Sequence, residues 1–493
     1  MASNREIQKM PTGISGLDEI LQGGYISGNT YLIRGGPGTG KTTAGIHFLY
    51  EGACKGEKTL LISLSESLDK LLRDASQKGL DLENTSFLDL TPSANDVSCD
   101  ASYNVFSPAE VEQPSFMQKI TEQLETIKPD RVFVDGITQL QYLSPDIYQF
   151  RKQILALIKI ATSQIGTVLL SSEDSKSVSD DDLQFMSDGV INLEYINDER
   201  GVRVTKFRGS DYKHGFHTMQ IMDNGIIIYP RLDPREVKRE FIFETISSGI
   251  PELDKLLYGG IEKGTATVIS GPTGVGKTTL GVQFAKEASE RGERTVIYTF
   301  EEGKESLLKR MKAVNIPISE MLDQNTLSVV KVNSLEYTPD QFAYLIRNDV
   351  EHMNTKIVMI DSISGYLLSF SKGPRDKGEM LRHIHALSEY LKNMGVTMLL
   401  LNETHSITGD FTVSEYGISY LADSIVFLRY VELKGELRKV IGVLKKRMSD
   451  FEKTLRELEI TSSGLKVGRP LSDLRGVLTG NPEFIDDEKN CNY

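Results

Sequence analysis

The sequence predicts an α/β protein built from two similar domains, each with a mostly parallel sheet flanked by helices and closed by a β-rich segment. Three observations lead to this fold class. The chain of 493 residues is too long for one ordinary core. Apolar strands alternate with helical segments along it. A glycine-rich loop with its flanking strand and helix occurs twice, 236 residues apart, which indicates an internal duplication.

The repeat and the local composition set the predicted domain boundaries. They give a first domain at residues 1–230, a linker at 231–238, a second domain at 239–467 and a flexible tail at 468–493. The linker contains Pro234 and several charges, and the tail carries an acidic run at Asp486. The polar segment between Thr91 and Ser115, punctuated by proline and serine, is predicted to be a surface loop.

The two loops both fit the pattern G-x-x-x-x-G-K-[ST]. They read Gly35-Gly36-Pro37-Gly38-Thr39-Gly40-Lys41-Thr42 and Gly271-Pro272-Thr273-Gly274-Val275-Gly276-Lys277-Thr278, followed by Thr43 and Thr279. A buried strand is expected before each loop and a helix after it. Glycines let backbone N–H groups surround a triphosphate, and a helix N-terminus attracts anions. The pattern therefore predicts two ATP sites, with Lys41 and Lys277 on the β- and γ-phosphates and Thr42 and Thr278 on Mg²⁺.

A second strand is expected at 58–64 and at 294–300. It ends at Ser65-Glu66 in the first copy and at Glu301-Glu302 in the second, and a helix follows in both. A carboxylate at this place can activate water or a hydroxyl for attack on the γ-phosphate. Glu66, Glu301 and Glu302 are therefore candidate catalytic residues, and Glu301 is also a candidate metal ligand.

The next strand, at 131–135 and at 356–361, is apolar and closed by Asp135 or Asp361. A carboxylate at the end of a parallel strand that faces the phosphate loop is the Walker B pattern, which binds Mg²⁺. A further apolar strand is expected at 166–170 and at 396–401. Ligands of such sheets bind at the carboxyl ends of the strands, where these loops and acidic ends converge.

Each copy is expected to close with short β-strands. They are predicted at 190–195, 202–207 and 225–229 in the first copy, and at 424–431, 439–444 and 458–460 in the second. A Lys-x-Arg segment follows the same strand in both copies. The segments read Lys206-Phe207-Arg208-Gly209 and Lys445-Lys446-Arg447-Met448.

The composition describes an ordinary globular chain. Its net charge of −13 argues against a main role in gripping nucleic acid. Cys54, Cys99 and Cys491 have no metal-binding or disulfide spacing and are expected to be free thiols in a reducing cytoplasm. No apolar run is long enough to span a membrane, and no signal segment is recognisable.

Together these residues resemble the KaiC family, whose members are tandem RecA-like P-loop ATPases. The resemblance runs from about Pro11 to Val467. It is most specific in the box Gly13-Ile14-Ser15-Gly16-Leu17-Asp18 and its copy at Gly249, in Phe300-Glu301-Glu302, in His405-Ser406-Ile407-Thr408, in the segment from Tyr430 to Glu436, and in Lys206-Phe207-Arg208-Gly209.

The resemblance implies a homohexamer of two stacked rings with Mg·ATP between neighbouring protomers. It also implies that a neighbour's Lys-x-Arg reaches the γ-phosphate, so the expected nucleotide contacts include Lys206, Phe207, Arg208, Ser210, Lys445, Lys446 and Arg447. It implies a circadian or signalling role with small partners like the clock's KaiA and KaiB, and autophosphorylation on serine or threonine in the second domain.

Two departures from the family pattern matter. Ser65 stands where the general base is expected, and a hydroxyl cannot take a proton as a carboxylate can, so the first domain is expected to turn ATP over slowly. Ser419 matches the first phosphoacceptor, but Tyr420 occupies the second. Ser419 is therefore the candidate acceptor, and a two-site phosphorylation cycle is not expected.

Two other functions stay open on the residues. One is a nucleotide-gated scaffold, in which ATP assembles the rings without kinase activity. The other is a DNA-dependent motor of the RecA or DnaB kind, against which the net charge and the absence of a basic, aromatic-rich tract weigh.

Overall fold

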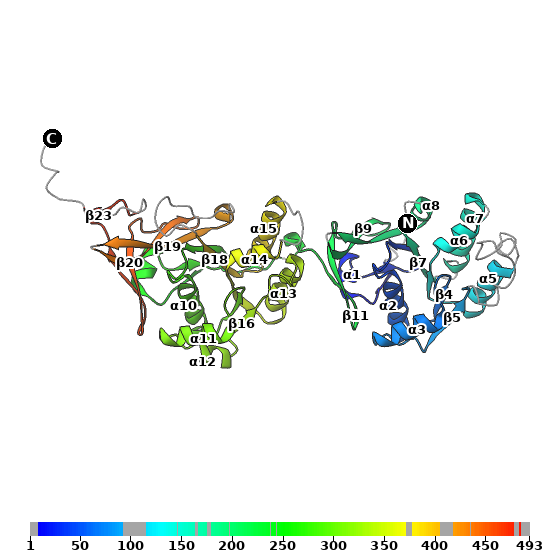
Figure 1. The fold of residues 1–493 in the computed structure, drawn as a ribbon, viewed down its shortest axis with the longest axis horizontal. Helices are drawn as coiled ribbons and strands as arrows, with labels where there is room; N and C mark the ends of the chain where they lie inside the picture. The colour runs from blue at the N-terminus through cyan, green and yellow to red at the C-terminus, as the bar shows by residue number, and fades with distance from the viewer. Residues whose placement is uncertain are drawn as a thin grey trace, which may run out of the picture. The chain divides into compact units, whose positions relative to one another are not determined.

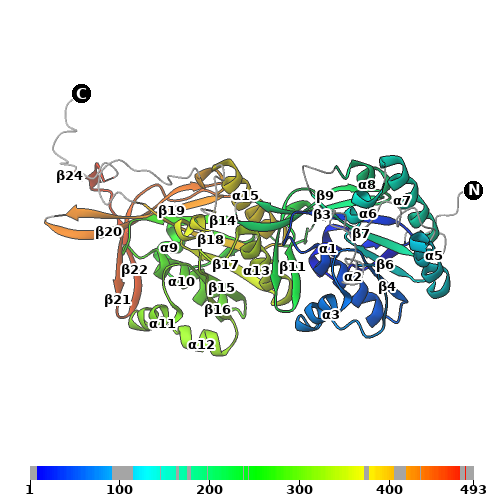
Figure 2. The same cartoon turned by 45° about the vertical axis from the view of Figure 1, so that its right-hand side comes forward.

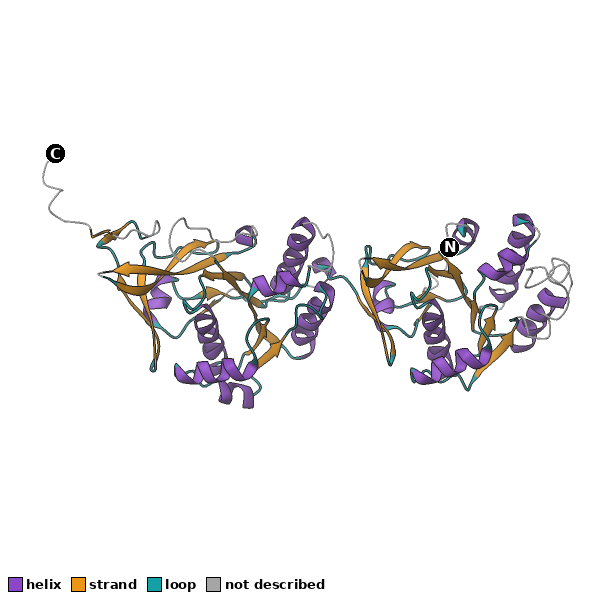
Figure 3. Cartoon of the chain, in the orientation of Figure 1, coloured by secondary structure: helices purple, strands orange, loops and turns teal. Residues whose placement is uncertain are grey.

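The computed structural model describes residues 8–91, 115–144, 146–162, 166–174, 179–196, 198–236, 238–242, 244–370, 377–404, 418–433, 435–477 and 483–484. Contacts divide the chain into two compact units, Met1–Arg231 and Leu232–Tyr493. Each unit contains a nine-stranded sheet with helices on both of its faces (Figure 1; Figure 3). The predicted fold class of two α/β domains is confirmed.

The first unit has the strand order β11-β10-β9-β8-β3-β7-β6-β4-β5. Its large sheet consists of β3 (Thr30–Gly35), β4 (Thr59–Ser63), β5 (Thr85–Asp89), β6 (Arg131–Asp135), β7 (Thr167–Glu173), β8 (Gly189–Ile196), β9 (Glu199–Phe207), β10 (His217–Met222) and β11 (Gly225–Tyr229). Strands β8, β3, β7, β6, β4 and β5 are parallel to one another. Strands β9, β10 and β11 continue the sheet as antiparallel strands. A small ribbon pairs β1 (Lys9–Met10) with β2 (Tyr25–Ile26).

Helices cover both faces of this sheet, so two apolar cores form. One core lies under α1 (Ser15–Ile20), α2 (Lys41–Cys54) and α3 (Leu68–Gln77). The other lies under α5 (Ser115–Ile127), α6 (Thr138–Leu143), α7 (Ile147–Thr162) and α8 (Asp181–Met186). The turned view separates these two groups of helices (Figure 2). Because both faces are covered, the central parallel strands β3, β4, β6 and β7 are buried along nearly their whole length.

The second unit repeats this plan with the order β16-β15-β17-β18-β14-β19-β20-β21-β22. Its strands are β12 (Thr245–Ile246), β13 (Ile261–Glu262), β14 (Ala266–Gly271), β15 (Arg294–Thr299), β16 (Leu327–Lys331), β17 (Thr355–Asp361), β18 (Thr397–Glu403), β19 (Ser424–Leu433), β20 (Glu436–Lys446), β21 (Arg456–Thr461), β22 (Gly464–Pro470), β23 (Leu474–Arg475) and β24 (Glu483–Phe484). Its helices are η1 (Pro234–Glu236), α9 (Pro251–Leu256), α10 (Lys277–Glu290), α11 (Lys304–Ala313), α12 (Ile318–Asp323), α13 (Pro339–His352), α14 (Ile363–Leu368), α15 (Lys377–Asn393) and η2 (Ile418–Tyr420).

Several features near the ends and edges were not predicted. The edge strands β5 and β16 and the closing strands β10 and β22 complete the sheets. Beyond Val467, strand β22 continues to Pro470, and Val477 packs with Val431 and Val440. The predicted surface loop falls largely on residues 92–114, which lie outside the described residues, as do residues 405–417 with the family-like His405 to Thr408.

Candidate functional site

Each glycine-rich loop joins a central strand to a helix. The loop leaves β3 or β14 in the middle of its sheet, and Gly40 or Gly276 caps the helix that follows. Both glycines have positive φ, 101° and 118°, which a residue with a side chain adopts only at a cost. The first N–H groups of α2 and α10 therefore lie at the carboxyl ends of the parallel strands, where they can donate hydrogen bonds to phosphate oxygens.

The loop lysines bend back over their own loops. The Nζ of Lys41 donates to the carbonyl oxygens of Gly35 and Gly36 at 2.8 and 2.9 Å, and the Nζ of Lys277 donates to Gly271 and Pro272, both at 2.9 Å. Burial lowers the pKa of both lysines, while nearby carboxylates act in the opposite direction. Burial removes part of the water around the two ammonium groups. The oxygens of a bound triphosphate can take the place of that water.

The Walker B aspartates meet the loop threonines in both units. The Thr278 hydroxyl donates to Asp361 Oδ2 at 2.8 Å, and the Thr42 hydroxyl lies 3.2 Å from Asp135 Oδ2. A hydroxyl beside one carboxylate is a donor set that fits Mg²⁺, which takes few protein ligands and completes its shell with water and phosphate. Within the described ranges, no group of three or more His, Cys, Asp or Glu side chains could hold a metal by itself.

The environments of the two aspartates differ. Burial raises the pKa of both carboxyls. Asp135 accepts a second hydrogen bond, from the Ser171 hydroxyl at 2.7 Å, whereas the matching position on β18 is Leu401. Asp361 instead lies near the Arg310 guanidinium, which acts against the effect of burial. Sequence reasoning missed Ser171 and Arg310, because neither belongs to a recognisable motif.

The acidic pair of the second unit follows β15 directly. Glu301 Oε1 accepts a hydrogen bond from the Ser362 hydroxyl at 2.6 Å, and Ser362 comes directly after the Walker B aspartate. Glu302 has separate partners: its Oε1 accepts from Ser306 at 2.7 Å, and its Oε2 pairs with Arg310. The two glutamates therefore point to different surroundings, and Glu301 is the one hydrogen-bonded to the residue that follows the Walker B aspartate.

The first unit lacks this arrangement. Ser65 takes the place of Glu301, and Gly136 takes the place of Ser362. A Cβ added at Gly136 would lie 2.7 Å from the Cβ of Ser65, so the two positions are in contact. Glu66 instead forms an ion pair with Lys70 at 2.8 Å, one turn along α3. Glu66 therefore corresponds to Glu302, not to Glu301.

A cavity of about 510 Å³ opens beside the first loop. It extends from the phosphate loop along α3 to the hairpin of β10 and β11, so it has room for more than the phosphates. Its lining residues are Gly38, Gly40, Lys41, Thr42, Thr43, Ile46, Glu66, Leu71, Asp74, Gln77, Lys78 and Ile221. The residues from α3 and Ile221 were not predicted, since no motif marks them.

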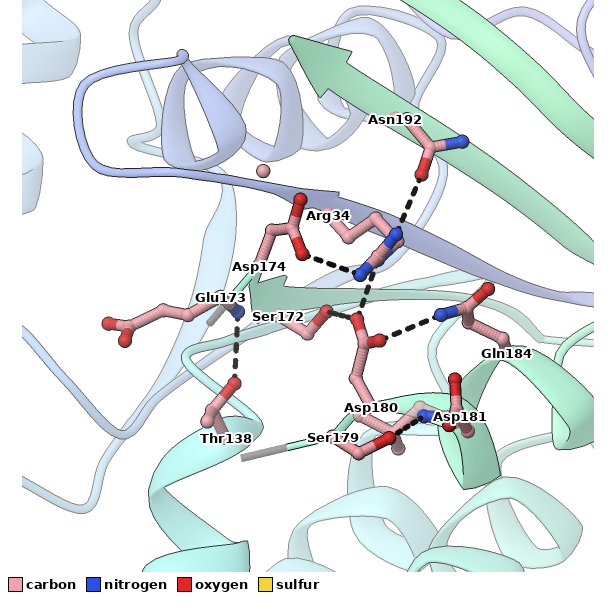
Figure 4. Close-up of polar contacts among 12 residues, drawn as sticks. Arg34, Thr138, Ser172, Glu173, Asp174, Ser179, Asp180, Asp181, Gln184 and Asn192 are labelled. Atoms are coloured by element: carbon pink, nitrogen blue, oxygen red, sulfur yellow. Dashed lines mark hydrogen bonds and ion pairs between the residues drawn. The ribbon is translucent and has the colours of Figure 1, made fainter. Parts of the chain in front are cut away.

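An ionic network supports the strand that leads into the first loop (Figure 4). Arg34 donates to Asp180 at 2.7 Å, to Asp174 at 2.8 Å and to Asn192 at 3.2 Å. Asp180 also accepts from Ser172 at 2.8 Å and from Gln184 at 2.7 Å. This network joins β3, β7, β8 and α8. An arginine inside an otherwise apolar strand just before the loop was the available sequence signal.

The Lys-x-Arg segments lie at the other end of each sheet. Lys206 pairs with Val190 near the start of β8, and Lys445 pairs with Ile425 near the start of β19. Both strands run parallel to the strand that carries the loop, so their starts lie opposite to the phosphate site of the same unit. Half-exposed Arg208 and Arg447 follow them, with side-chain exposures of 59% and 49%.

The other residues expected near these segments are placed differently. Phe207 is buried and stacks on Tyr31 at 5.5 Å, and Lys446 is buried with an ion pair to Glu262 at 3.0 Å. The Ser210 hydroxyl donates to the carbonyl oxygen of Asp211. These three side chains therefore have partners within their own units.

Ser419 lies at the same end of the second sheet, in η2. Its carbonyl oxygen accepts from Lys445 Nζ at 3.0 Å, and the carbonyl of Tyr420 accepts from Arg447 at 3.0 Å. The candidate phosphoacceptor and the exposed cations of the second unit thus form one surface, remote from the loop of that unit.

Comparison with known proteins agrees with this duplicated architecture. The family model "ATPase: KaiC" matches residues 10–233 and again residues 246–472. The chain belongs to the KaiC ATPase family. It is similar to the circadian clock oscillator protein KaiC of Prochlorococcus marinus strain MIT 9313, with 26% identity over 99% of this chain and 98% of that protein.

Other KaiC relatives match at similar levels. The circadian clock protein KaiC3 of Synechocystis strain PCC 6803 is 26% identical over 97% of this chain and 95% of its own length. The KaiC of Picosynechococcus strain PCC 7002 is 27% identical over 98% and 94%. The resemblance expected from the sequence is confirmed, and KaiC family membership supports an ATPase activity for the chain. In the part of the chain that the structure describes, no helix is long and apolar enough to cross a membrane.

Proposed function

We propose that this KaiC family member is an ATPase whose second domain, predicted at 239–467, carries the faster chemistry. The supporting observation is that Lys277, the Thr278–Asp361 pair and Glu301 converge at the carboxyl ends of β14, β15 and β17. When bound, Mg²⁺ would be held by Thr278 and Asp361 and would neutralise phosphate charge. Lys277 binds the β- and γ-phosphates, and Glu301 takes the proton of the attacking water or hydroxyl.

The test compares the full chain with and without the Glu301→Gln substitution. Glu301→Gln keeps the hydrogen bond to Ser362 but removes the base, so second-domain phosphate release is expected to fall by roughly 100-fold or more. The assay is run in a Lys41→Ala background, so that the first domain does not contribute. Unchanged release in Glu301→Gln would reject Glu301 as the base.

The first domain, predicted at 1–230, is proposed to bind Mg·ATP and to hydrolyse it slowly. Lys41, Thr42 and Asp135 supply the binding groups, but Ser65 and Gly136 supply no carboxylate in place of Glu301 and Ser362. This domain would then act mainly in nucleotide-gated assembly. The scaffold function considered from the sequence would therefore apply to the first half of the chain. The Ser65→Glu variant is expected to raise phosphate release in a Lys277→Ala background, and no increase would count against the proposal.

We also propose a homohexamer in which a neighbouring copy completes each ATP site. Lys206, Arg208, Lys445 and Arg447 lie at the sheet end opposite to their own loops, so they cannot reach the nucleotide of their own unit. In the proposed assembly they serve a nucleotide on a neighbouring copy. A cation supplied in this way stabilises the charge of phosphoryl transfer. Phe207, Ser210 and Lys446 would then support the segment from within their own domain.

We further propose that Ser419 is autophosphorylated, and its placement indicates which loop would supply the phosphate. Ser419 precedes Ser424, which pairs with Thr267, and four residue steps along β14, or roughly 13 Å, separate Thr267 from the start of the loop. A phosphate donor would therefore come from the loop of another copy. The names of the relatives refer to a circadian clock, which supports a role in timing or signalling. A cytoplasmic location and small partners like KaiA and KaiB remain part of this proposal, because the family resemblance implies them.

A further inference from the structure

The two nucleotide sites differ in the charge that the helix after the second strand brings to them. Arg310 of α11 lies two turns after Glu302 and pairs with its Oε2. The same place in α3 of the first unit is Asp74, since the two helices match at the spacing of 236 residues, with Leu71 and Leu307 both buried. The loops before them match too: Ser63 and Thr299 each donate to the carbonyl oxygen of the glutamate three residues on.

The position of Asp74 in the first unit indicates where the Arg310 side chain points in the second. Asp74 lines the 510 Å³ cavity beside the first phosphate loop. By the repeat, Arg310 faces the corresponding region of the second unit. Its charge also acts on the Asp361 carboxyl, at the phosphate end of that region. Arg310 is therefore a cation beside the reacting centre of its own chain, unlike Lys445 and Arg447 at the opposite end of the sheet.

Glu302 depends on this cation. Its two carboxylate oxygens accept hydrogen bonds from Ser306 and Arg310, and its side chain is 23% exposed. Without Arg310, Glu302 would carry an unpaired negative charge on the residue next to Glu301, and this charge would repel the phosphates of a nucleotide bound at the second site. In the first unit, exposed Lys70 performs the pairing with Glu66 instead.

We propose that Arg310 is a positioning residue of the second ATP site, which neutralises Glu302 and holds it aside so that Glu301 alone faces the attacking group. This inference rests on the proposed ATPase function of that site. It assigns different tasks to the two adjacent glutamates: Glu301 acts on the proton, and Glu302 acts only through its ion pair.

The experiment is a double-mutant cycle on Mg·ATP binding in the full chain. Titration with a fluorescent ATP analogue (MANT-ATP) in the Lys41→Ala background reports the second site. Arg310→Met is expected to weaken binding about 10-fold, because Glu302 is left unpaired. The double variant Arg310→Met/Glu302→Gln is expected to return to within about twofold of the Lys41→Ala parent, because the unpaired charge is gone.

Matched controls separate this role from a structural one. Lys309→Met removes an exposed cation one residue earlier in α11 and is expected to leave binding unchanged. Arg310→Lys keeps the charge and is expected to restore most of the affinity. Normal binding by Arg310→Met, or a double variant as weak as Arg310→Met, would overturn the proposal, the latter because Arg310 would then contact the nucleotide itself.

The failure of the wider function gives a different result. If the Lys41→Ala parent and Lys41→Ala/Lys277→Ala bind the analogue equally, the second site does not use its phosphate loop. The proposed ATPase site would then fail, and the Arg310 proposal would fall with it.

Discussion

At the scale of single residues, the positions where the two copies differ explain more than the shared motifs do. His47 of α2 is buried, and its Nε2 accepts the N–H of Ile226 at 2.9 Å. The same place in α10 is Gln283, which donates to the carbonyl of Ser248 at 2.8 Å. Both side chains connect the loop helix to neighbouring backbone, but only the histidine titrates.

His47 makes the first domain sensitive to acid. Burial lowers the pKa of His47 to about 4, from 6.5 in the unfolded chain. Below pH 6.5, folding therefore requires His47 to release its proton. The contribution of His47 to the free energy of unfolding is complete above pH 6.5 and is lost as the pH falls towards 4. The loss approaches about 3 kcal/mol. Urea unfolding at several pH values should show this slope, and His47→Gln, which copies the second domain, should remove it. An identical slope in both proteins would contradict the assignment.

Arg131 is a second residue present in one copy only. Its guanidinium is fully buried, donates to the carbonyl oxygens of Pro11 and Phe48 at 2.7 and 2.9 Å, and pairs with Glu57. The second domain has apolar Ile357 at this register.

Arg131→Ala should therefore destabilise the first domain by about 3 kcal/mol, because Glu57 and two carbonyls lose their partner. Urea unfolding measures the loss, and Ile357→Val, expected to cost about 1 kcal/mol in the second domain, is the control. A midpoint equal to that of the unmodified chain would show that the Arg131 contacts contribute no net stability.

At the scale of elements, the sequence predicted what repeats and missed what closes the sheets. The loop strands, the Walker B strands and their helices were recognisable because apolar runs, glycine patterns and acidic ends occur together. The edge strands β5 and β16 are only half buried, so they lack a clear apolar run. Strands β10 and β22 form because they pair with their neighbours in the closing hairpins. The local sequence pattern does not predict this pairing.

The same limit applies to the site. Its motif residues could be located from the sequence, but their partners could not, since Ser171, Ser362 and Arg310 reach the site from other strands and helices. Proximity across the sheet decides these contacts, and spacing along the chain does not reveal it.

Side chains of the closing hairpins also lie close to the phosphate loops. A Cβ added at Gly276 would lie 2.4 Å from Ile460 Cδ1, and one at Gly40 would lie 3.0 Å from Ile221 Cδ1. Gly276→Ala is expected to weaken ATP binding at the second site by 10-fold or more, through this clash and a φ of 118°. Adding Ile460→Ala should recover part of the affinity in the same titration. Wild-type binding by Gly276→Ala would show that the loop adjusts freely.

At the scale of the whole molecule, each unit carries its phosphate loop and its Lys-x-Arg segment at opposite ends of one sheet. The phosphate loop lies at the carboxyl ends of the parallel strands, while the Lys-x-Arg segment and, in the second unit, Ser419 lie at their starts. A single copy cannot bring these ends together within one unit, because the sheet itself separates them. The topology is therefore consistent with the proposed ring, in which each reaction should need two copies.

Incubation with γ-labelled ATP and Mg²⁺ tests this account most directly, with released phosphate and protein-bound label followed together. The account predicts label on Ser419 of the unmodified chain and none on Lys277→Ala or Ser419→Ala alone. Mixing those two variants should restore label on Ser419 of the Lys277→Ala chains, since one copy supplies the loop and the other the acceptor. Phosphate release with no bound label, or a mixture that stays unlabelled while the unmodified chain is labelled, would contradict phosphate transfer between copies.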